Sequence, residues 1–200
     1  MQKSIKILLI LFIAFFAWEF FLRISPSLVL EQLATQYQTN ATGLGAIASC
    51  YYLGYSLIQI PAGIILDKFS IKIIGISSIS VCVLAILTFI FIKDLAIALS
   101  ARTIMGAASA FSFIGVLAIA KRYSPENFSF ITSITISLGT LIAALAQVGA
   151  SFFVSASSWH MPFIILSLSG IILIVLITFT KNKSEPKTNL EDNKIDNKID

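Results

Sequence analysis

Two side chains of opposite charge lie inside the first long apolar segment of the chain. Glu19 and Arg23 are four residues apart in a run that extends from about residue 5 to residue 30. If this run is a helix, the spacing places both side chains on one face, with the acid first, which is the favourable order for an ion pair. An ionised group deep in a bilayer costs at least about 2.5–3.5 kcal/mol, so it normally faces a protein interior or a water-filled path. The pair therefore predicts an internal polar site in a membrane helix that is more than an anchor.

A second arginine, Arg102, lies in a later apolar run, at residues 95–120. At about 1.5 Å per residue, Arg23 and Arg102 both fall within about 10 Å of the bilayer midplane, on the same side, so they could share one site. Alternatively, each guanidinium group extends along its own helix to the nearer interface. Both interpretations remain open for Arg102, whereas the deeper partner Glu19 favours the internal site for Arg23. Two arginines against one glutamate leave about one positive charge, which favours an anionic group on a ligand.

The composition indicates a membrane protein. Hydrophobic residues make up 57% of the 200 residues, charged residues make up 12%, and the mean hydropathy is +0.92. Soluble domains have about 45–50% apolar and about 25% charged residues. The apolar runs, each long enough for a spanning helix, lie at about residues 5–30, 43–66, 73–92, 95–120, 130–154 and 163–180. We predict an all-α membrane protein with six transmembrane helices within residues 1–180, and a disordered polar cytoplasmic tail at residues 181–200.

The basic residues between the predicted spans indicate how the chain is oriented. One side of the membrane collects Lys3, Lys6, Lys68, Lys72, Lys121, Arg122 and the five lysines of the tail, and the other side has Lys93. The positive-inside rule then predicts a multi-pass protein of the inner (cytoplasmic) membrane with both termini cytoplasmic. This placement explains the net charge of +4, so the lipid bilayer, and no nucleic acid, is the expected partner. Cys50 and Cys82 fall in apolar runs, so no metal site and no cofactor is predicted.

Polar residues also recur at helical spacing in the second and fifth spans. Tyr51, Tyr55 and Gln59 follow one another at four-residue intervals, with Tyr52 beside them. Either a lined cavity or hydrogen bonds between packed helices would explain these tyrosines. The small or polar residues of the fifth span are explained by close helix packing, except Gln147, which we assign to a cavity. The candidate substrate-binding residues are therefore Glu19, Arg23, Tyr51, Tyr52, Tyr55, Gln59, Arg102 and Gln147.

The loop after the second span carries a recognisable motif. Its sequence, Gly63-Ile-Ile-Leu-Asp67-Lys68-Phe-Ser-Ile-Lys72, resembles the Gly-x-x-x-Asp-(Arg/Lys)-x-Gly-x-(Arg/Lys) signature between helices two and three of the major facilitator superfamily. Four positions match, and a serine stands where the second glycine is usual. The stretch Arg102-Thr-Ile-Met-Gly is similar to the Arg-x-x-x-Gly of helix four in that superfamily.

The resemblance implies a fold and an activity. The fold would be one half of a major facilitator, built of two inverted three-helix repeats, in which helices one, two, four and five line a central path. The activity would be secondary transport of a small solute by alternating access. The charges of Arg23, Arg102 and Glu19 favour an anionic or zwitterionic solute, with Glu19 as a candidate proton-coupling carboxylate of a symporter. Residues Gly63, Asp67, Lys68 and Lys72 would form a conformational-gating loop. Because the family has two six-helix halves, a second half or a homodimer would complete the transporter.

Two other classes of function were weighed against transport. A non-transporting truncated remnant or a membrane interaction protein would share the same motifs, and the polar tail slightly favours it. An intramembrane enzyme has little support, since the histidine of the chain, His160, lies in a predicted loop beside Trp159. An interfacial role explains that position better than catalysis does, so no catalytic residue is predicted.

Overall fold

The computed structural model describes residues 3–152, 154 and 159–180 as a bundle of long helices. Its elements are α1 (Lys3–Ile24), η1 (Ser25–Leu28), α2 (Leu30–Gln36), α3 (Ala41–Lys68), α4 (Ile71–Phe91), α5 (Leu95–Tyr123), η2 (Pro125–Asn127), α6 (Phe128–Ser151) and α7 (Met161–Phe179). Six helical segments are long and apolar enough to cross a membrane. The predicted all-α class with six spanning helices is confirmed, and the predicted tail at residues 181–200 lies outside the described residues.

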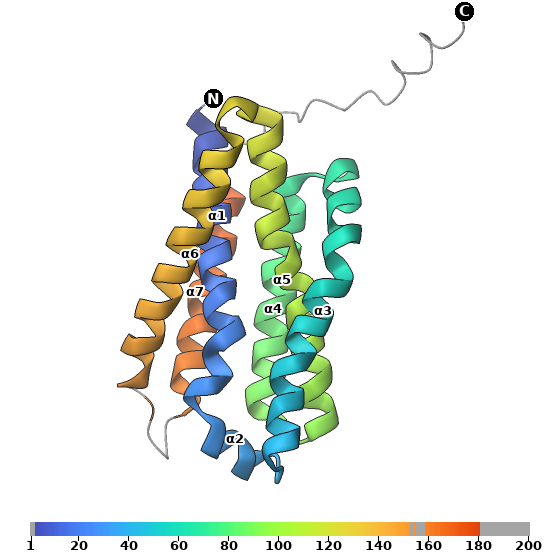
Figure 1. Ribbon diagram of the computed structural model, residues 1–200, viewed down its shortest axis with the longest axis vertical. Coiled ribbons are helices and arrows are strands. Elements are labelled where there is room, and N and C mark those ends of the chain that lie inside the picture. The colour runs from blue at the N-terminus through green and yellow to red at the C-terminus, as the bar shows by residue number, and fades with distance from the viewer. Residues whose placement is uncertain (1–2, 153, 155–158, 181–200) are drawn as a thin grey trace, which may run out of the picture.

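The spanning helices form two layers. In Figure 1, α6, α1, α5 and α3 lie side by side as a four-helix layer, and α7 and α4 lie behind it. Helix α1 packs against α5, α6 and α7, helix α5 packs against α3 and α4, and α4 packs against α7. Exchanging α1 with α5, α3 with α6 and α4 with α7 leaves this set of contacts unchanged. The arrangement is therefore consistent with two inverted three-helix repeats.

The two ends of the bundle differ in what they carry. The N-terminus, the α3–α4 connection and the α5–α6 connection lie at one end, called here the N-terminal end, and α2 lies at the other, the α2 end (Figure 1). At the α2 end, side chains cap the N-termini of two long helices, α3 and α5. The carboxamide oxygen of Asn40 accepts from the backbone N–H groups of Thr42 and Gly43, and the Asp94 carboxylate accepts from the N–H of Ile97 at 2.9 Å. Such caps satisfy N–H groups that the helix leaves unpaired.

Helix α1 is shorter than the apolar run that contains it. The run continues to about residue 30, but the α-helix ends at Ile24 and the chain turns through η1, which carries Pro26. A proline cannot donate to the preceding turn and disfavours helical geometry at the residue before it. The segment predicted as a plain connection, residues 31–42, contains most of the short helix α2. Hydropathy alone therefore missed a change of chain direction inside an apolar run.

Helices α3 and α5 cross at two glycines. A methyl group on Gly54 would overlap the backbone carbonyl of Thr103, and one on Gly106 would overlap the backbone carbonyl of Tyr51. The missing side chains let the two backbones approach closely, as small residues do between membrane helices. The motif glycine at position 106 is thus a packing residue of the α3–α5 contact.

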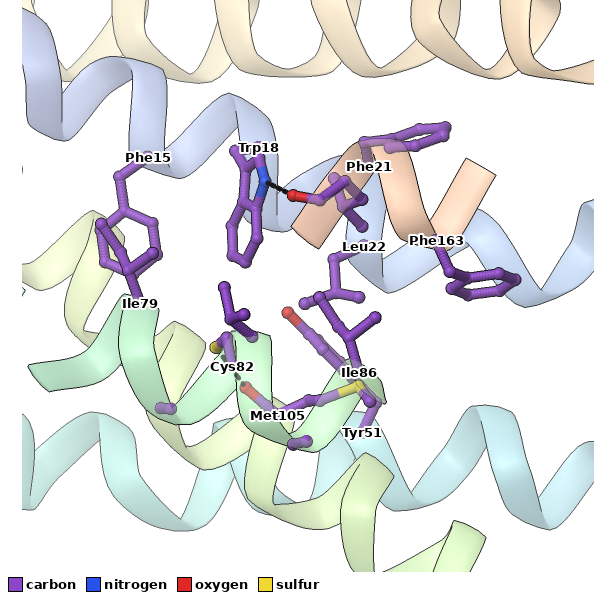
Figure 2. Packing of buried hydrophobic residues seen from close by; sticks show 14 of the residues in the cluster. Phe15, Trp18, Phe21, Leu22, Tyr51, Ile79, Cys82, Ile86, Met105 and Phe163 are labelled. Atoms are coloured by element: carbon purple, nitrogen blue, oxygen red, sulfur yellow. Dashed lines mark hydrogen bonds between the residues drawn. The ribbon is translucent and has the colours of Figure 1, made fainter. Parts of the chain in front are cut away.

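The centre of the bundle is filled by aromatic and aliphatic side chains from α1 and α4. Phe15 and Trp18 of α1 lie above Ile79 and Ile86 of α4 (Figure 2). The indole N–H of Trp18 donates to the backbone carbonyl of Leu166 at 2.9 Å and so joins α1 to α7. A buried indole needs such a partner. The apolar core and this hydrogen bond together fix the two layers against each other.

Gly54→Ala should destabilise the bundle. The added methyl group forces the α3 and α5 backbones apart, and we expect the free energy of unfolding in detergent to fall by about 1–3 kcal/mol. The matched control is Gly45→Ala, in the same helix, where an added methyl group meets nothing within 4 Å. The control should be neutral or stabilising by up to ~1 kcal/mol, because alanine favours the helix. Equal effects of the two changes would contradict the close crossing.

Candidate functional site

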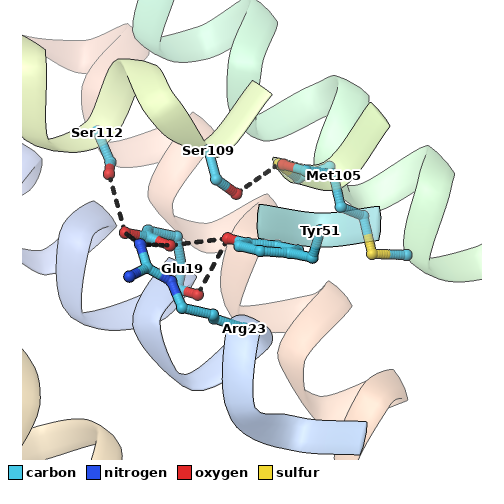
Figure 3. A network of polar contacts seen from close by, with 7 residues as sticks. Glu19, Arg23, Tyr51, Met105, Ser109 and Ser112 are labelled. Atoms are coloured by element: carbon cyan, nitrogen blue, oxygen red, sulfur yellow. Dashed lines mark hydrogen bonds and ion pairs between the residues drawn. The ribbon is translucent and has the colours of Figure 1, made fainter. Parts of the chain in front are cut away.

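The predicted pair of Glu19 and Arg23 forms an ion pair inside the bundle. The distances from Nη2 of Arg23 to the two carboxylate oxygens of Glu19 are 3.0 and 3.2 Å. The Glu19 side chain is fully buried, whereas the Arg23 side chain keeps 14% of its surface exposed. Both lie on α1, in the middle of the four-helix layer (Figures 1 and 3). The pair is therefore buried on the carboxylate side and partly open on the guanidinium side.

Two further helices donate hydrogen bonds to the Glu19 carboxylate. The Tyr51 hydroxyl of α3 donates at 2.7 Å and the Ser112 hydroxyl of α5 at 3.4 Å (Figure 3). With Arg23, the carboxylate thus has three donors. A buried carboxylate needs such partners to offset its lost hydration. The sequence indicated Tyr51, but nothing in it distinguished Ser112 from the other serines of α5.

Aromatic rings surround the Arg23 guanidinium. Its central carbon lies 4.5 Å from the ring centroid of Tyr55 and 4.9 Å from that of Phe20, distances typical of cation–π contacts. The ring of Tyr52, which is 49% exposed, lies 5.8 Å away. The Nε atom of Arg23 is buried and has no hydrogen-bond partner among the described residues. The guanidinium group is thus enclosed by aromatic rings.

Arg102 is buried in the bundle, so the alternative in which it extends to the interface is wrong. Its side chain is 0% exposed. It donates to the backbone carbonyls of Leu22 at 3.2 Å and Arg23 at 3.1 Å, and to that of Ile47 in α3 at 3.3 Å. The first two carbonyls belong to the last turn of α1, where carbonyls need donors from outside the helix. The Leu22 carbonyl also accepts from the Ser25 hydroxyl at 2.9 Å. Arg102 therefore caps the C-terminal end of α1. Its bond to the Arg23 carbonyl also fixes the backbone from which the Arg23 side chain extends.

The remaining predicted residues, Gln59 and Gln147, differ in how far they are buried. Gln59 of α3 is exposed. Gln147 of α6 is half-buried, and its amide donates to the hydroxyl of Ser27 at 2.8 Å. This contact joins α6 to η1, so Gln147 lies toward the α2 end of the four-helix layer.

The motif loop between α3 and α4 makes contacts with the ends of two helices. Asp67 forms an ion pair of 3.1 Å with Arg122 of α5, which also donates to the Leu66 carbonyl at 2.6 Å. Lys72 donates to the carbonyls of Thr178 and Thr180 at 2.8 and 2.6 Å. Arg122 thus caps the end of α3 and Lys72 the end of α7, where a positive charge is favourable.

The other two residues of the motif, Gly63 and Lys68, have open space around them. Lys68 is exposed, and a methyl group added to Gly63 would meet nothing within 4 Å. The pairing of Asp67 with Arg122 was not predicted from the sequence. Its only signal was its place at the end of the fourth apolar run, beside Lys121, on the same side as the motif loop.

His160 and Tyr37 lie at the α2 end, outside the spanning helices. The His160 ring stacks on Trp159 with centroids 3.8 Å apart, and burial lowers the pKa of His160. Burial raises the pKa of Tyr37 to about 12, so its hydroxyl remains a donor to the backbone carbonyl of Phe89. Both aromatic groups thus pack as neutral residues, as expected for side chains at a membrane interface.

Comparison with protein families identifies the chain. Residues 7–198 match the model of the Major Facilitator Superfamily. Because the match covers nearly the whole chain, the protein belongs to this superfamily, and the resemblance seen in its motifs is confirmed. The chain therefore belongs to a superfamily of membrane transporters.

Individual relatives agree with this assignment. An "Uncharacterized transporter" of Rickettsia bellii is 23% identical over 164 residues, covering 80% of this chain and 39% of the relative. The "Uncharacterized transporter YybO" of Bacillus subtilis is 23% identical over 171 residues, covering 84% and 38%. The chain thus spans about two fifths of the length of these curated relatives. The E. coli fucose:proton symporter FucP shares the fold, with a TM-score of 0.63 and 22% identity over 86% of this chain and 49% of that one.

Arg23→Met should strongly destabilise the protein, because it leaves the Glu19 carboxylate buried without its cation. We expect the free energy of unfolding to fall by about 3–5 kcal/mol. Adding Glu19→Gln should restore part of that loss, since a neutral amide needs no counter-charge. Unfolding of the single and double variants in detergent measures both effects.

The control for this experiment is Asp67→Asn, at the ion pair whose carboxylate is 77% exposed. It should cost less than about 1 kcal/mol, as exposed ion pairs do. A double variant no more stable than Arg23→Met alone would show that the charge of Glu19 is not what the arginine compensates.

Proposed function

We propose that this chain forms one six-helix half of a secondary active transporter that moves a small anionic or zwitterionic solute by alternating access. The observation that carries the proposal is the partly open guanidinium group of Arg23, which is held by a fully buried carboxylate in the four-helix layer. A buried ion pair is costly in a structural helix and typical of a solute or ion path. The superfamily assignment and the shared fold support the same conclusion.

A second six-helix half would face the four-helix layer. Among the spanning helices, α3 and α6 bury the smallest share of their residues, and they flank α1 and α5 in that layer (Figure 1). The second half would come from further polypeptide or from a second copy of this chain. The solute site would then lie between the four-helix layer and the second half, with Arg23 opening toward it beside Tyr52 and Tyr55.

The arginine favours a carboxylate or phosphate group on the solute. A guanidinium group binds such anions through two parallel hydrogen bonds, and the Arg23 side chain keeps 14% of its surface exposed. Tyr52, Gln59 and Gln147 would contact the rest of the solute in this proposal. Arg102 would act as a positioning residue, because its three nitrogen atoms donate to backbone carbonyls.

Glu19 would couple transport to a proton. A solute anion that binds Arg23 competes with Glu19 for the same charge. A carboxylate that loses its cation in a buried site is stabilised by taking up a proton, because the neutral acid avoids the cost of a buried charge. Solute and proton would thus be bound together and released together, as in a symporter.

The loop between α3 and α4 would gate the movement of the two halves. The Asp67–Arg122 pair and the Lys72 cap tie the N-terminal end of the bundle to α5 and α7, while Gly63 and Lys68 remain open for contact with the second half. By the positive-inside rule, the basic residues of this end favour a location on the cytoplasmic side of the inner membrane.

Arg23→Lys should weaken solute binding and keep the protein folded. Lysine preserves the ion pair with Glu19 but lacks the planar fork. We expect the half-saturation concentration for uptake to rise roughly 10- to 100-fold, the value of one or two lost charged hydrogen bonds. Uptake of labelled carboxylates, phosphates and amino acids by cells expressing the full chain measures this effect.

The control for uptake is Lys93→Gln, which removes a charge at the α2 end and should leave the half-saturation concentration unchanged. If Arg23→Lys left the half-saturation concentration unchanged for every transported solute, Arg23 would not be part of the solute site. Absence of uptake for all of these solutes by the unmodified chain would contradict transport by this chain.

Glu19→Gln should abolish proton-driven accumulation of the solute but leave solute exchange across the membrane intact. Glutamine has nearly the same shape and retains partners for Tyr51 and Ser112, but it has no proton to exchange. We expect solute accumulation driven by a proton gradient to be lost, while exchange of labelled for unlabelled solute persists. Measurement of both in proteoliposomes tests the coupling, and full accumulation by the variant would exclude Glu19 as its carrier.

A further inference from the structure

A groove runs between α6 and α7 on the side of the bundle away from α3. It has a volume of about 500 Å³, within the range of small-molecule sites. Its floor is the face of α1 that carries Ala17 and Trp18, and its walls include Ala146 and Ala150 of α6 and Ser169 of α7. The small side chains on facing helices create the hollow. Helices α6 and α7 both pack against α1, which closes the groove at its base.

The rim of the groove is apolar and uncovered. Ile142 of α6 is 47% exposed, and Ile165 and Ile172 of α7 are 52% and 59% exposed. These residues lie inside helices that are long and apolar enough to cross a membrane. The mouth of the groove is therefore continuous with the surface that the hydrocarbon region of a bilayer would cover.

The groove is elongated along the helices. On α7 its lining extends from Pro162 to Leu173, a rise of roughly 16 Å at 1.5 Å per residue. It thus runs from the middle of the bundle toward the α2 end, parallel to the direction in which lipid chains lie.

The lining offers no free polar group to a water molecule. It contains no charged residue. Its two polar side chains are already occupied, since the indole of Trp18 donates to the Leu166 carbonyl and the Ser169 hydroxyl, and that hydroxyl donates to Leu166 as well. Apolar cavities of this kind do not hold water. An empty groove would lose the dispersion contacts of its walls, which a hydrocarbon chain would supply.

We propose that this groove is a binding site for one acyl chain of a bilayer phospholipid. The chain enters between α6 and α7 and lies against Ala17 and Trp18, with no contact to a headgroup, because the lining carries no basic residue. The site is separate from the ion pair of Glu19 and Arg23 and does not depend on the transport proposal. It would hold α6 and α7 apart at a defined spacing on α1.

The two tryptophans of the chain allow a direct test. Trp159→Phe leaves Trp18 as the single tryptophan. Trp18 is only 7% exposed and lies on the groove floor, so a lipid chain reaches it through the groove. The full-length Trp159→Phe protein is reconstituted in phosphatidylcholine with acyl chains brominated near their middle, because bromine quenches tryptophan fluorescence on contact. Strong quenching relative to non-brominated lipid is the expected result.

Filled variants in the same background test the groove itself. Ala146→Leu and Ala150→Leu place bulk in the groove and should lose most of the quenching. Ala144→Leu, on the exposed side of α6 and outside the groove, should retain it. The emission maximum in non-brominated lipid shows whether Trp18 stays buried in each variant. Equal quenching in all three variants, or none in the Trp159→Phe parent, would overturn the proposal.

Discussion

The guanidinium group of Arg102 is the interaction on which the arrangement of α1, α3 and α5 depends. Helix α1 ends at Ile24, inside the apolar part of the chain, so the carbonyls of its last turn need donors from outside the helix. In lipid, each unsatisfied carbonyl would cost several kcal/mol. Arg102 of α5 donates to two of them and to a carbonyl of α3. One buried cation therefore stabilises the end of one helix and ties it to two others. The same contacts fix the backbone of Arg23, so the candidate site is built on a rigid base.

The same solution recurs at the N-terminal end of the bundle. Arg122 donates to a carbonyl in the last turn of α3, and Lys72 donates to carbonyls at the end of α7. In each case a basic side chain from one helix meets the negative end of another helix dipole. The charges of the motif loop thus have a structural role within this half, in addition to any contact with a second half. In the proposed mechanism, the loop residues that gate movement would also cap helix ends, which would couple the stability of these ends to movement at the loop.

The sequence predicted the parts of the site that depend on local spacing. The four-residue separation of Glu19 and Arg23 predicts an ion pair in any helix, and the apolar runs predict the spanning segments. The sequence did not predict contacts that depend on how helices pack. The hydrogen bond from Ser112 to Glu19 could not be predicted, because it depends on where the neighbouring helices lie. For the same reason, the sequence left open whether the Arg102 side chain extends to the interface or into the bundle. The end of α1 at Ile24 was missed because several residues after Pro26 are still apolar. The apolar run therefore extends beyond the end of the helix.

The crossing of α3 and α5 has a consequence for how this protein can change during evolution. Gly54 and Gly106 each face backbone atoms of the other helix rather than a side chain. A larger residue at either position therefore cannot be accommodated by a smaller partner, because a peptide carbonyl is the same in every sequence. Second-site suppressors of such a change cannot arise at the point of contact. They would have to shift an entire helix, and Tyr51, which donates to Glu19, would shift with it. The two glycines thus tie the geometry of the polar site to positions that carry no polar group.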